Sequence, residues 1–391
     1  MNPNALLEKF QHLFNRPAAL LARAPGRVNL LGEHVDYNDG LVLPAAIDRE
    51  VHLAAAARTD GLISLAALDL DQRVDFRLDD LDARITADGG PLPGWACYPA
   101  GVAWALREAG LAVGGLDAAY TSSVPIGAGL SSSAAVEVGF AVLWQALGGW
   151  NVSALQLAQF CLRAENGYVG LSCGLMDQFA SACGVKDHAL LFDTRSLEWS
   201  AAPLPEGIAL VIADSGVRRS LTHSGYNERR AACEAALASL QRFMPHVHSL
   251  RDVPATEFAA YAPYLEEIPR KRAEHVIKEI ARVDSMVRAL QRRDLQAIGA
   301  LMYAGHASLR NLYEVSTPEL DTLVELTRAL PGSIGARLTG AGFGGCTVNL
   351  VESARAGDFI DGLLSGYQAA TGCTAQAYLC QASPGAGLLA L

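Results

Sequence analysis

A short polar segment, residues 26–40, carries the residue types that could hold a small polyhydroxylated molecule. A cation, two carboxylates, an imidazole and a phenol lie in it between glycines, as Arg27, Glu33, His34, Asp36 and Tyr37. The two carboxylates can accept hydrogen bonds from hydroxyl groups, and the imidazole can donate or accept. The guanidinium adds a permanent cation that could stabilise an oxyanion or a phosphate. The alternative for this segment is a polar turn with solvated charges.

Apolar residues on both sides of the polar segment favour the binding site over the solvated turn. Those between positions 22 and 31 predict a strand that enters the segment, and residues 41–44 predict a strand that leaves it. A scaffold of this kind would fix the polar side chains in place. Tyr37, Asn38 and Asp39 receive no binding role from the pattern, and a turn-forming role is expected for them.

A glycine–serine loop, residues 124–135, lies between a predicted strand at 118–123 and a predicted helix at 134–147. Its glycines would let the backbone approach a polyanion, and the helix start would offer free N–H groups. The loop lacks the GxxxxGK[ST] pattern of an ordinary P-loop. We expect it to cradle nucleotide phosphates, with a turn and a serine N-cap as the alternative. The predicted phosphate-binding residues are Gly127, Ala128, Gly129, Leu130, Ser131, Ser132 and Ser133.

Two carboxylates further along the chain are candidates for acid–base or metal chemistry. Asp177 lies among apolar and small residues, which predicts a partly buried acid, with a helix cap as the alternative. Glu165, twelve residues earlier, is either a second carboxylate for a metal ion or a surface charge. His275 and Glu279 lie four apart in a predicted long helix at 269–307, and we expect a surface pair there.

Length and composition bound the fold and the possible partners. A chain of 391 residues predicts two domains of mixed strand and helix, with a cleft between them as a natural site. The prolines and glycine within 201–207 place the boundary so that the domains are 1–205 and 206–391. The net charge of −10 argues against nucleic acid and anionic membrane as partners. A third glycine stretch, residues 337–348, is expected to close tightly over another loop.

The cysteines and the apolar stretches predict a cytoplasmic protein. The eight cysteines include no CxxC pair, which argues against a zinc site or a disulfide scaffold and favours reduced thiols. The first residues show no secretory signal. The long uncharged stretch at 138–162 is interrupted by polar residues and predicts two buried helices joined at Gly148–Gly149 rather than a membrane span.

Taken together, these segments resemble the galactokinase family of the GHMP small-molecule kinase superfamily over nearly the whole chain. The matching segments, in the expected order, are 26–44, 125–135, 224–230, 308–321 and 337–348. The resemblance implies an α+β fold of two domains, each a mixed or antiparallel sheet packed with helices, with the active site in the cleft and a final strand that returns to the N-terminal domain. It also implies the ATP-dependent phosphorylation of D-galactose at the anomeric hydroxyl, the first step of the Leloir pathway.

The resemblance assigns roles to individual residues. Those that would hold galactose are Glu33, His34, Asp36, Tyr226 and the backbone around Gly174, while Arg27 and Asp177 would flank its anomeric hydroxyl. Ser132 and Glu165 match positions that hold Mg²⁺, and the glycine–serine loop would wrap the phosphates of ATP. Trp95 matches a tryptophan near the adenine pocket, although Cys97 stands where the family usually has Asn.

The implied mechanism makes Asp177 the base that accepts the proton of the sugar hydroxyl. A carboxylate beside Arg27 stays ionised and is a weak base, but the same cation would stabilise the sugar alkoxide. Two other functions remain open: a kinase for a related sugar such as N-acetylgalactosamine, and a non-catalytic galactose- and ATP-binding regulator of the yeast type. Those regulators lack a Ser-Ala pair in the ATP loop, whereas Ser133–Ala134 is present here. A monomer is expected.

Overall fold

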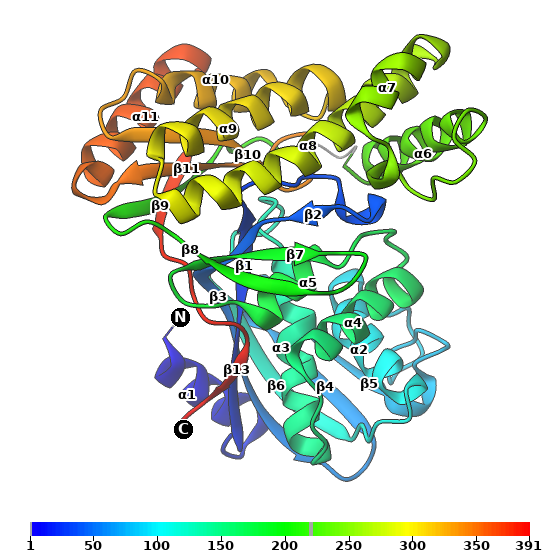
Figure 1. Ribbon diagram of the computed structural model, residues 1–391. Coiled ribbons are helices and arrows are strands. Elements are labelled where there is room, and N and C mark those ends of the chain that lie inside the picture. Colours follow the sequence, from blue (N-terminus) through cyan, green and yellow to red (C-terminus); the bar gives the residue numbers. More distant parts are fainter. Residues whose placement is uncertain (1, 219–221) are drawn as a thin grey trace.

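The computed structural model describes residues 2–218 and 222–391, without the side chains of 222–224, and these residues form three β-sheets (Figure 1). The first sheet has the strand order β13-β1-β3-β6-β4-β5 and is mixed, because β4 runs parallel to β6 while the other pairs are antiparallel. Its strands are β1 (Leu20–Asn29), β3 (Pro44–Arg58), β4 (Leu62–Ala67), β5 (Gln72–Arg77), β6 (Gly115–Ser122) and β13 (Gly387–Leu389).

The other two sheets are antiparallel. The three-stranded sheet contains β2 (Leu41–Val42), β7 (His188–Asp193) and β8 (Trp199–Pro203). The four-stranded sheet has the order β10-β11-β9-β12 and contains β9 (Ile208–Asp214), β10 (Ser333–Thr339), β11 (Cys346–Glu352) and β12 (Gln376–Cys380). This mixture of sheets and helices confirms the α+β class.

Helices pack against the six-stranded and the four-stranded sheet (Figure 1). The described α-helices are α1 (Pro3–Phe14), α2 (Cys97–Glu108), α3 (Ser132–Gly148), α4 (Ala154–Ala164), α5 (Met176–Cys183), α6 (Thr222–Gln241), α7 (Ala255–Tyr261), α8 (Glu267–Arg292), α9 (Leu295–Ser308), α10 (Pro318–Thr327) and α11 (Ala356–Thr371). Helix α8 also contacts β2 and β8 of the three-stranded sheet. Within the described residues, none of these helices is both long and apolar enough to cross a membrane.

Strand β3 shows how the first sheet is buried on both faces. Leu53 packs into the main core under α3, whereas its neighbour Ala54 joins Phe10 of α1 in a separate apolar cluster. Successive side chains of a strand point to opposite faces, so one run of small and apolar residues supports both layers. In the second half, α9 and α10 pack on β10, and α11 packs on β9, β11 and β12.

Two helix predictions had different outcomes. The stretch at 138–162 does form two helices, α3 and α4, as predicted. The single helix predicted at 269–307 is wrong, because α8 ends at Arg292 and Arg293 takes a left-handed conformation with φ of 54°. Asp294 then caps α9 by accepting a hydrogen bond from the backbone N–H of Ala297.

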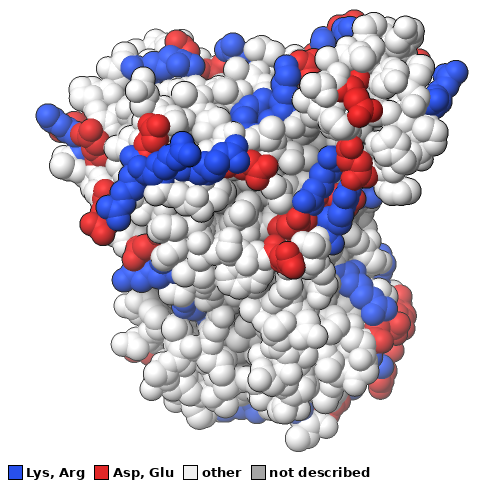
Figure 2. All heavy atoms as spheres, viewed as in Figure 1, with Lys and Arg blue, Asp and Glu red and all other residues white. Residues whose placement is uncertain are grey.

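Charged side chains of both signs lie side by side on the face shown in Figure 2, mainly over the upper part of the molecule, where the second half of the chain lies. The net charge of −10 is therefore not spread as one acidic field on this face. All eight cysteines lie among the described residues, and all are free thiols, as expected.

Candidate active site

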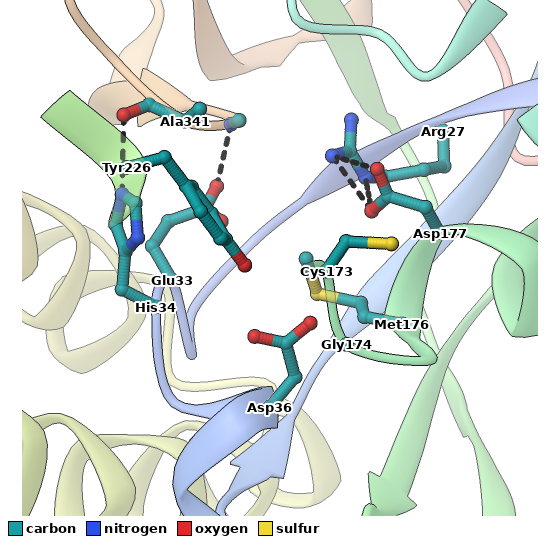
Figure 3. Close-up of a pocket in the computed structure, with 11 residues that line it drawn as sticks. Arg27, Glu33, His34, Asp36, Cys173, Gly174, Met176, Asp177, Tyr226 and Ala341 are labelled. Carbon is teal, nitrogen blue, oxygen red and sulfur yellow. Dashed lines mark hydrogen bonds and ion pairs between the residues drawn. The ribbon is translucent and has the colours of Figure 1, made fainter. Parts of the chain in front are cut away.

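A pocket forms where the two halves of the chain meet (Figure 3). It is lined by residues of β1, the polar segment, α5 and the loop before it, helix α6 and the third glycine stretch. The lining residues are Arg27, Glu33, His34, Asp36, Cys173, Gly174, Met176, Asp177, Tyr226, Gly340 and Ala341. Every residue predicted to bind sugar or to flank the reacting hydroxyl therefore lines one pocket.

Arg27 and Asp177 form a two-pronged ion pair at one side of the pocket (Figure 3). Arg27 donates from Nε to Oδ1 at 2.8 Å and from Nη2 to Oδ2 at 2.9 Å. Its Nη1 donates to the carbonyl oxygen of Gly129 at 2.6 Å, and Ser131 Oγ donates to Asp177 Oδ2 at 2.5 Å. Asp177 lies in the first turn of α5, but its carboxylate contacts the glycine–serine loop, so the helix-cap alternative is wrong.

Two further carboxylates face the pocket. Burial raises the pKa of Glu33, whose Oε1 accepts a hydrogen bond from the N–H of Gly340 at 2.7 Å. Burial, together with the nearby negative charges of Asp177 and Glu33, raises the pKa of Asp36 to about 7. A Cβ at Gly174 would lie 2.1 Å from Asp36 Oδ2, so a larger residue would displace this carboxylate. The Asp36 carboxylate and the Tyr226 hydroxyl point into the same space (Figure 3).

His34 lies at the pocket wall with both ring nitrogens occupied. Nε2 is 3.1 Å from the carbonyl oxygen of Ala341, which can only accept, so Nε2 carries the proton. Burial lowers the pKa of His34 to about 3, so the ring is neutral and Nδ1 accepts from the hydroxyl of Tyr37 at 3.0 Å. Tyr37 in turn accepts from Tyr313 at 2.7 Å. A sugar hydroxyl would have to displace Ala341 or Tyr37 to reach either nitrogen.

Residues from the second half hold the polar segment from behind, and the surface position predicted for two of them is wrong. His275 and Glu279 were expected on the surface, but both are fully buried. His275 Nε2 donates to the carbonyl oxygen of Glu33 at 3.1 Å, and Glu279 Oε1 accepts from the N–H of Gly32 at 3.0 Å. Arg337, also fully buried, donates to Glu279 at 3.1 Å. Buried apolar residues at 273, 276, 283 and 286 have helical spacing and mark this face.

The glycine–serine loop leads into α3, and no side chain of the described residues caps the first backbone N–H groups of that helix. Ser131 has a left-handed φ of 58° and makes no side-chain cap bond, so the N-cap alternative is wrong. The first N–H groups of a helix have no partner within the helix and favour an anion. The third glycine stretch closes over this loop, as expected, because a Cβ at Gly345 would lie 2.8 Å from the carbonyl oxygen of Ala128.

A second hollow lies beside the same loop and contains Trp95. Its lining is largely aromatic and apolar, as suits a flat ring. The lining residues are Ala67, Asp69, Leu70, Trp95, Tyr98, Tyr120, Ser122, Ile126, Gly127, Ser132, Ser133 and Val136. Trp95 belongs to the short helix η4 (Gly94–Ala96), and its indole N–H has no hydrogen-bond partner among the described residues.

Glu165 is buried beside the start of α3 and is not a surface charge. It begins the π-helical turn η5 (Glu165–Val169), directly after α4, and it hydrogen-bonds with Ser133. Mg²⁺ binds oxygen ligands such as carboxylates and hydroxyls. The protein usually supplies one or two of them, and phosphate oxygens and water molecules complete the coordination shell. The described residues contain no cluster of three or more His, Cys, Asp or Glu that could hold a metal ion, and the serine that contacts Glu165 is Ser133, the neighbour of the predicted ligand Ser132.

Comparisons with known proteins agree with this geometry. Residues 8–57 match the galactokinase galactose-binding signature, residues 98–185 the N-terminal domain of GHMP kinases and residues 286–368 their C-terminal domain. The curated galactokinase of Roseiflexus sp. (strain RS-1) is 45% identical over 99% of this chain and 97% of its own. The galactokinase of Chloroflexus aggregans is 42% identical over 96% of this chain and 95% of its own.

Solved structures show the same relationship. The crystal structure of Lactococcus lactis galactokinase complexed with galactose is 33% identical, with a TM-score of 0.93 over 99% of both chains. Methanococcus jannaschii mevalonate kinase, 18% identical with a TM-score of 0.65 over 93% of this chain and 98% of its own, shares the fold. The pocket, the glycine–serine loop and these full-length matches lead to one conclusion: the chain belongs to the galactokinase family, ATP-dependent sugar kinases of the GHMP superfamily.

Proposed function

We propose that this chain transfers the γ-phosphoryl group of ATP to the anomeric hydroxyl of D-galactose, giving galactose 1-phosphate and ADP. One observation carries the proposal: Asp177, held by Arg27 and Ser131, lies where the sugar pocket meets the glycine–serine loop. Asp177 accepts the hydroxyl proton as the sugar oxygen attacks the γ-phosphorus and the bond to the bridging oxygen of ADP breaks. Arg27 stabilises the developing negative charge on the sugar oxygen.

The remaining pocket residues would bind the sugar. Glu33 and Asp36 accept hydrogen bonds from its hydroxyl groups, Tyr226 donates or accepts, and the backbone at Gly174 completes the ring of polar contacts. His34 would form a wall, because its two nitrogens already have protein partners. The galactose named in the Lactococcus lactis structure supports this choice of substrate.

The nucleotide would lie along the loop. Backbone N–H groups of residues 127–133 bind its phosphates at the start of α3, and Trp95 stacks on the adenine ring. Ser132 and Glu165 would hold Mg²⁺, which supplies positive charge to the phosphate oxygens when bound. The same backbone N–H groups and Arg27 would offset further negative charge on the phosphoryl group.

We also propose the domain division at residues 205 and 206, with the last strand in the N-terminal domain. The pairing of β13 with β1 supports it. The enzyme is proposed to act as a monomer in the cytoplasm, because one chain supplies the whole pocket and all eight thiols are free.

ATP consumption measured against a panel of monosaccharides tests the proposal. The native chain should release ADP with galactose and much less with glucose or N-acetylgalactosamine, while Asp177→Asn should release little with any sugar. Equal turnover with N-acetylgalactosamine would identify a kinase for that sugar instead. Galactose binding without any ATP turnover would identify a non-catalytic regulator. The galactokinase relatives favour the first outcome.

A further inference from the structure

A buried amide joins two carboxyl groups next to the proposed active site, and the mechanism above does not use it. Gln178 on α5 donates from Nε2 to Glu137 Oε2 on α3 at 3.1 Å and to Glu165 Oε2 at 2.5 Å. Gln178 and Glu137 are fully buried, and Glu165 is 6% exposed. One side chain therefore ties Glu165 to two helices of the site.

The cluster is costly for the fold. Glu137 Oε1 and Gln178 Oε1 have no hydrogen-bond partner among the described residues. Two carboxyl groups sharing one amide also disfavour each other's charged form, and burial raises the pKa of both. Buried polar groups are usually fully paired, so an incompletely paired cluster of this kind is expected where function requires it.

The backbone geometry around the cluster also favours a functional role. Glu165 opens the π-helical turn η5, a rare geometry that is frequent at functional sites. Asp177 and Gln178 are consecutive on α5, so their side chains leave the helix in different directions. Asp177 reaches Arg27 in the sugar pocket, and Gln178 reaches Glu165. Helix α5 thus fixes both the proposed base and the proposed metal ligand.

We propose that Gln178, braced by Glu137, is a positioning residue that holds the carboxylate of Glu165 ready for the Mg²⁺ that accompanies ATP. This inference rests on the proposed function, in which Glu165 binds that ion. The amide hydrogen bond restricts the rotation of the Glu165 side chain before the ion arrives. Outer-shell partners of this type typically contribute a factor of about 10–100 in metal affinity.

The affinity of ADP, measured by titration calorimetry with and without Mg²⁺, tests the role of Gln178. Gln178→Met keeps the side-chain length and removes the donor. We expect this variant to bind ADP about 10–100-fold more weakly in Mg²⁺ and equally well in EDTA. Its affinity for galactose should stay close to that of the native chain, because Gln178 does not line the sugar pocket.

Asn349→Leu is the matched control, since it also removes a buried amide, whose Nδ2 donates to the carbonyl oxygen of Val211 at 2.8 Å in the other half. It should leave the Mg²⁺ dependence unchanged. If Gln178→Met does not fold, Gln178→Asn keeps an amide that is one methylene too short and should show the same selective loss.

A folded Gln178 variant with native Mg²⁺ dependence, or with equal losses in Mg²⁺ and EDTA, would overturn the inference. A native chain that phosphorylates galactose but binds ADP equally well with and without Mg²⁺ would overturn it too. A native chain without galactose turnover would instead reject the proposed function.

Discussion

Arg27 holds both carboxylate oxygens of Asp177, from Nε at 2.8 Å and from Nη2 at 2.9 Å. Arg27 is only 4% exposed, so its guanidinium has given up most of its water for this contact and for the carbonyl oxygen of Gly129. The pair therefore fixes the orientation of Asp177 and connects the sugar pocket to the glycine–serine loop. A change at Asp177 should affect both chemistry and stability.

Asp177→Asn separates base catalysis from positioning. The amide keeps the size of the carboxylate but cannot take up the sugar proton, so turnover should fall by about 10² or more. Galactose binding should survive, because Glu33, Asp36 and Tyr226 remain. Steady-state turnover and calorimetric binding check the two halves of the prediction, and an unfolding curve confirms that the variant is folded. Near-native turnover would leave Asp177 with a positioning role alone.

Asp36 should set the lower limit of the pH range for galactose. Burial, Asp177 and Glu33 raise its pKa to about 7, so below that pH the protonated carboxyl accepts hydrogen bonds less well. We expect kcat/KM for galactose to fall as the pH drops through about 7, and Asp36→Asn to show a lower but flatter profile. A native profile that is flat between pH 6 and 8 would contradict the assignment.

The raised pKa of Asp36 also predicts how the stability of the sugar-free protein changes with pH. The carboxyl of Asp36 has its folded pKa, about 7, above the unfolded value. Its contribution to stability is therefore fully present below about pH 4, the unfolded pKa, and is lost as the pH rises through about 7. Denaturant unfolding should show the native chain and Asp36→Asn with similar pH dependence below about pH 4, and the native chain losing stability relative to this always-neutral variant as the pH rises to about 7, so that the difference is largest toward pH 8.

Tyr37→Phe tests the hydrogen-bond chain behind the sugar pocket. The change removes the donor to His34 and leaves the hydroxyl of buried Tyr313 with only the weakly accepting thiol of Cys233, which should cost about 1–3 kcal/mol of stability. It also frees the His34 ring, so the KM for galactose should rise more than the KM for ATP. Tyr168→Phe is a suitable control, because it removes one buried hydrogen bond, to the carbonyl oxygen of Leu81, outside the sugar pocket. Equal effects of both variants on the KM for galactose would contradict the prediction.

Trp95→Leu should weaken nucleotide binding selectively. Stacking of an aromatic side chain on a base is worth about 1–3 kcal/mol, so the KM for ATP should rise by roughly tenfold while the KM for galactose stays constant. Trp104→Leu, a tryptophan outside the second hollow, should change neither value by that much. Fluorescence titration with ADP offers an independent measurement, and an unaltered ADP affinity in Trp95→Leu would exclude the stacking role.

The functional residues could be predicted from the sequence where most residues of one binding site lie in a single short segment. The polar segment and the glycine–serine loop could be recognised because their side chains and backbone act close to where they stand in sequence. His275, Glu279 and Arg337 hold the polar segment from more than 240 positions away. Helical spacing predicts that such residues share a face, but it does not say whether another half of the protein covers that face.

The break between α8 and α9 was missed for a different reason. Left-handed turns are usually signalled by glycine or asparagine, whereas here Arg293 adopts the conformation. The amide cluster at Gln178 could not be predicted from the sequence either, because three helices supply one side chain each. Local patterns therefore predicted the loops that touch substrate, while the supports behind them depended on tertiary packing.

The pairing of β13 with β1 has a consequence for how the protein is made. Leu21 pairs with Leu389, so the outer edge of β1 stays open while the ribosome adds the remaining residues. At about 5–20 residues per second, synthesis of that stretch takes roughly 20–70 s. An uncovered strand edge can recruit other chains. We therefore expect a chain truncated just before residue 387 to keep both substrate pockets but to aggregate more readily than the native chain, because the edge of β1 at residues 21–23 stays uncovered.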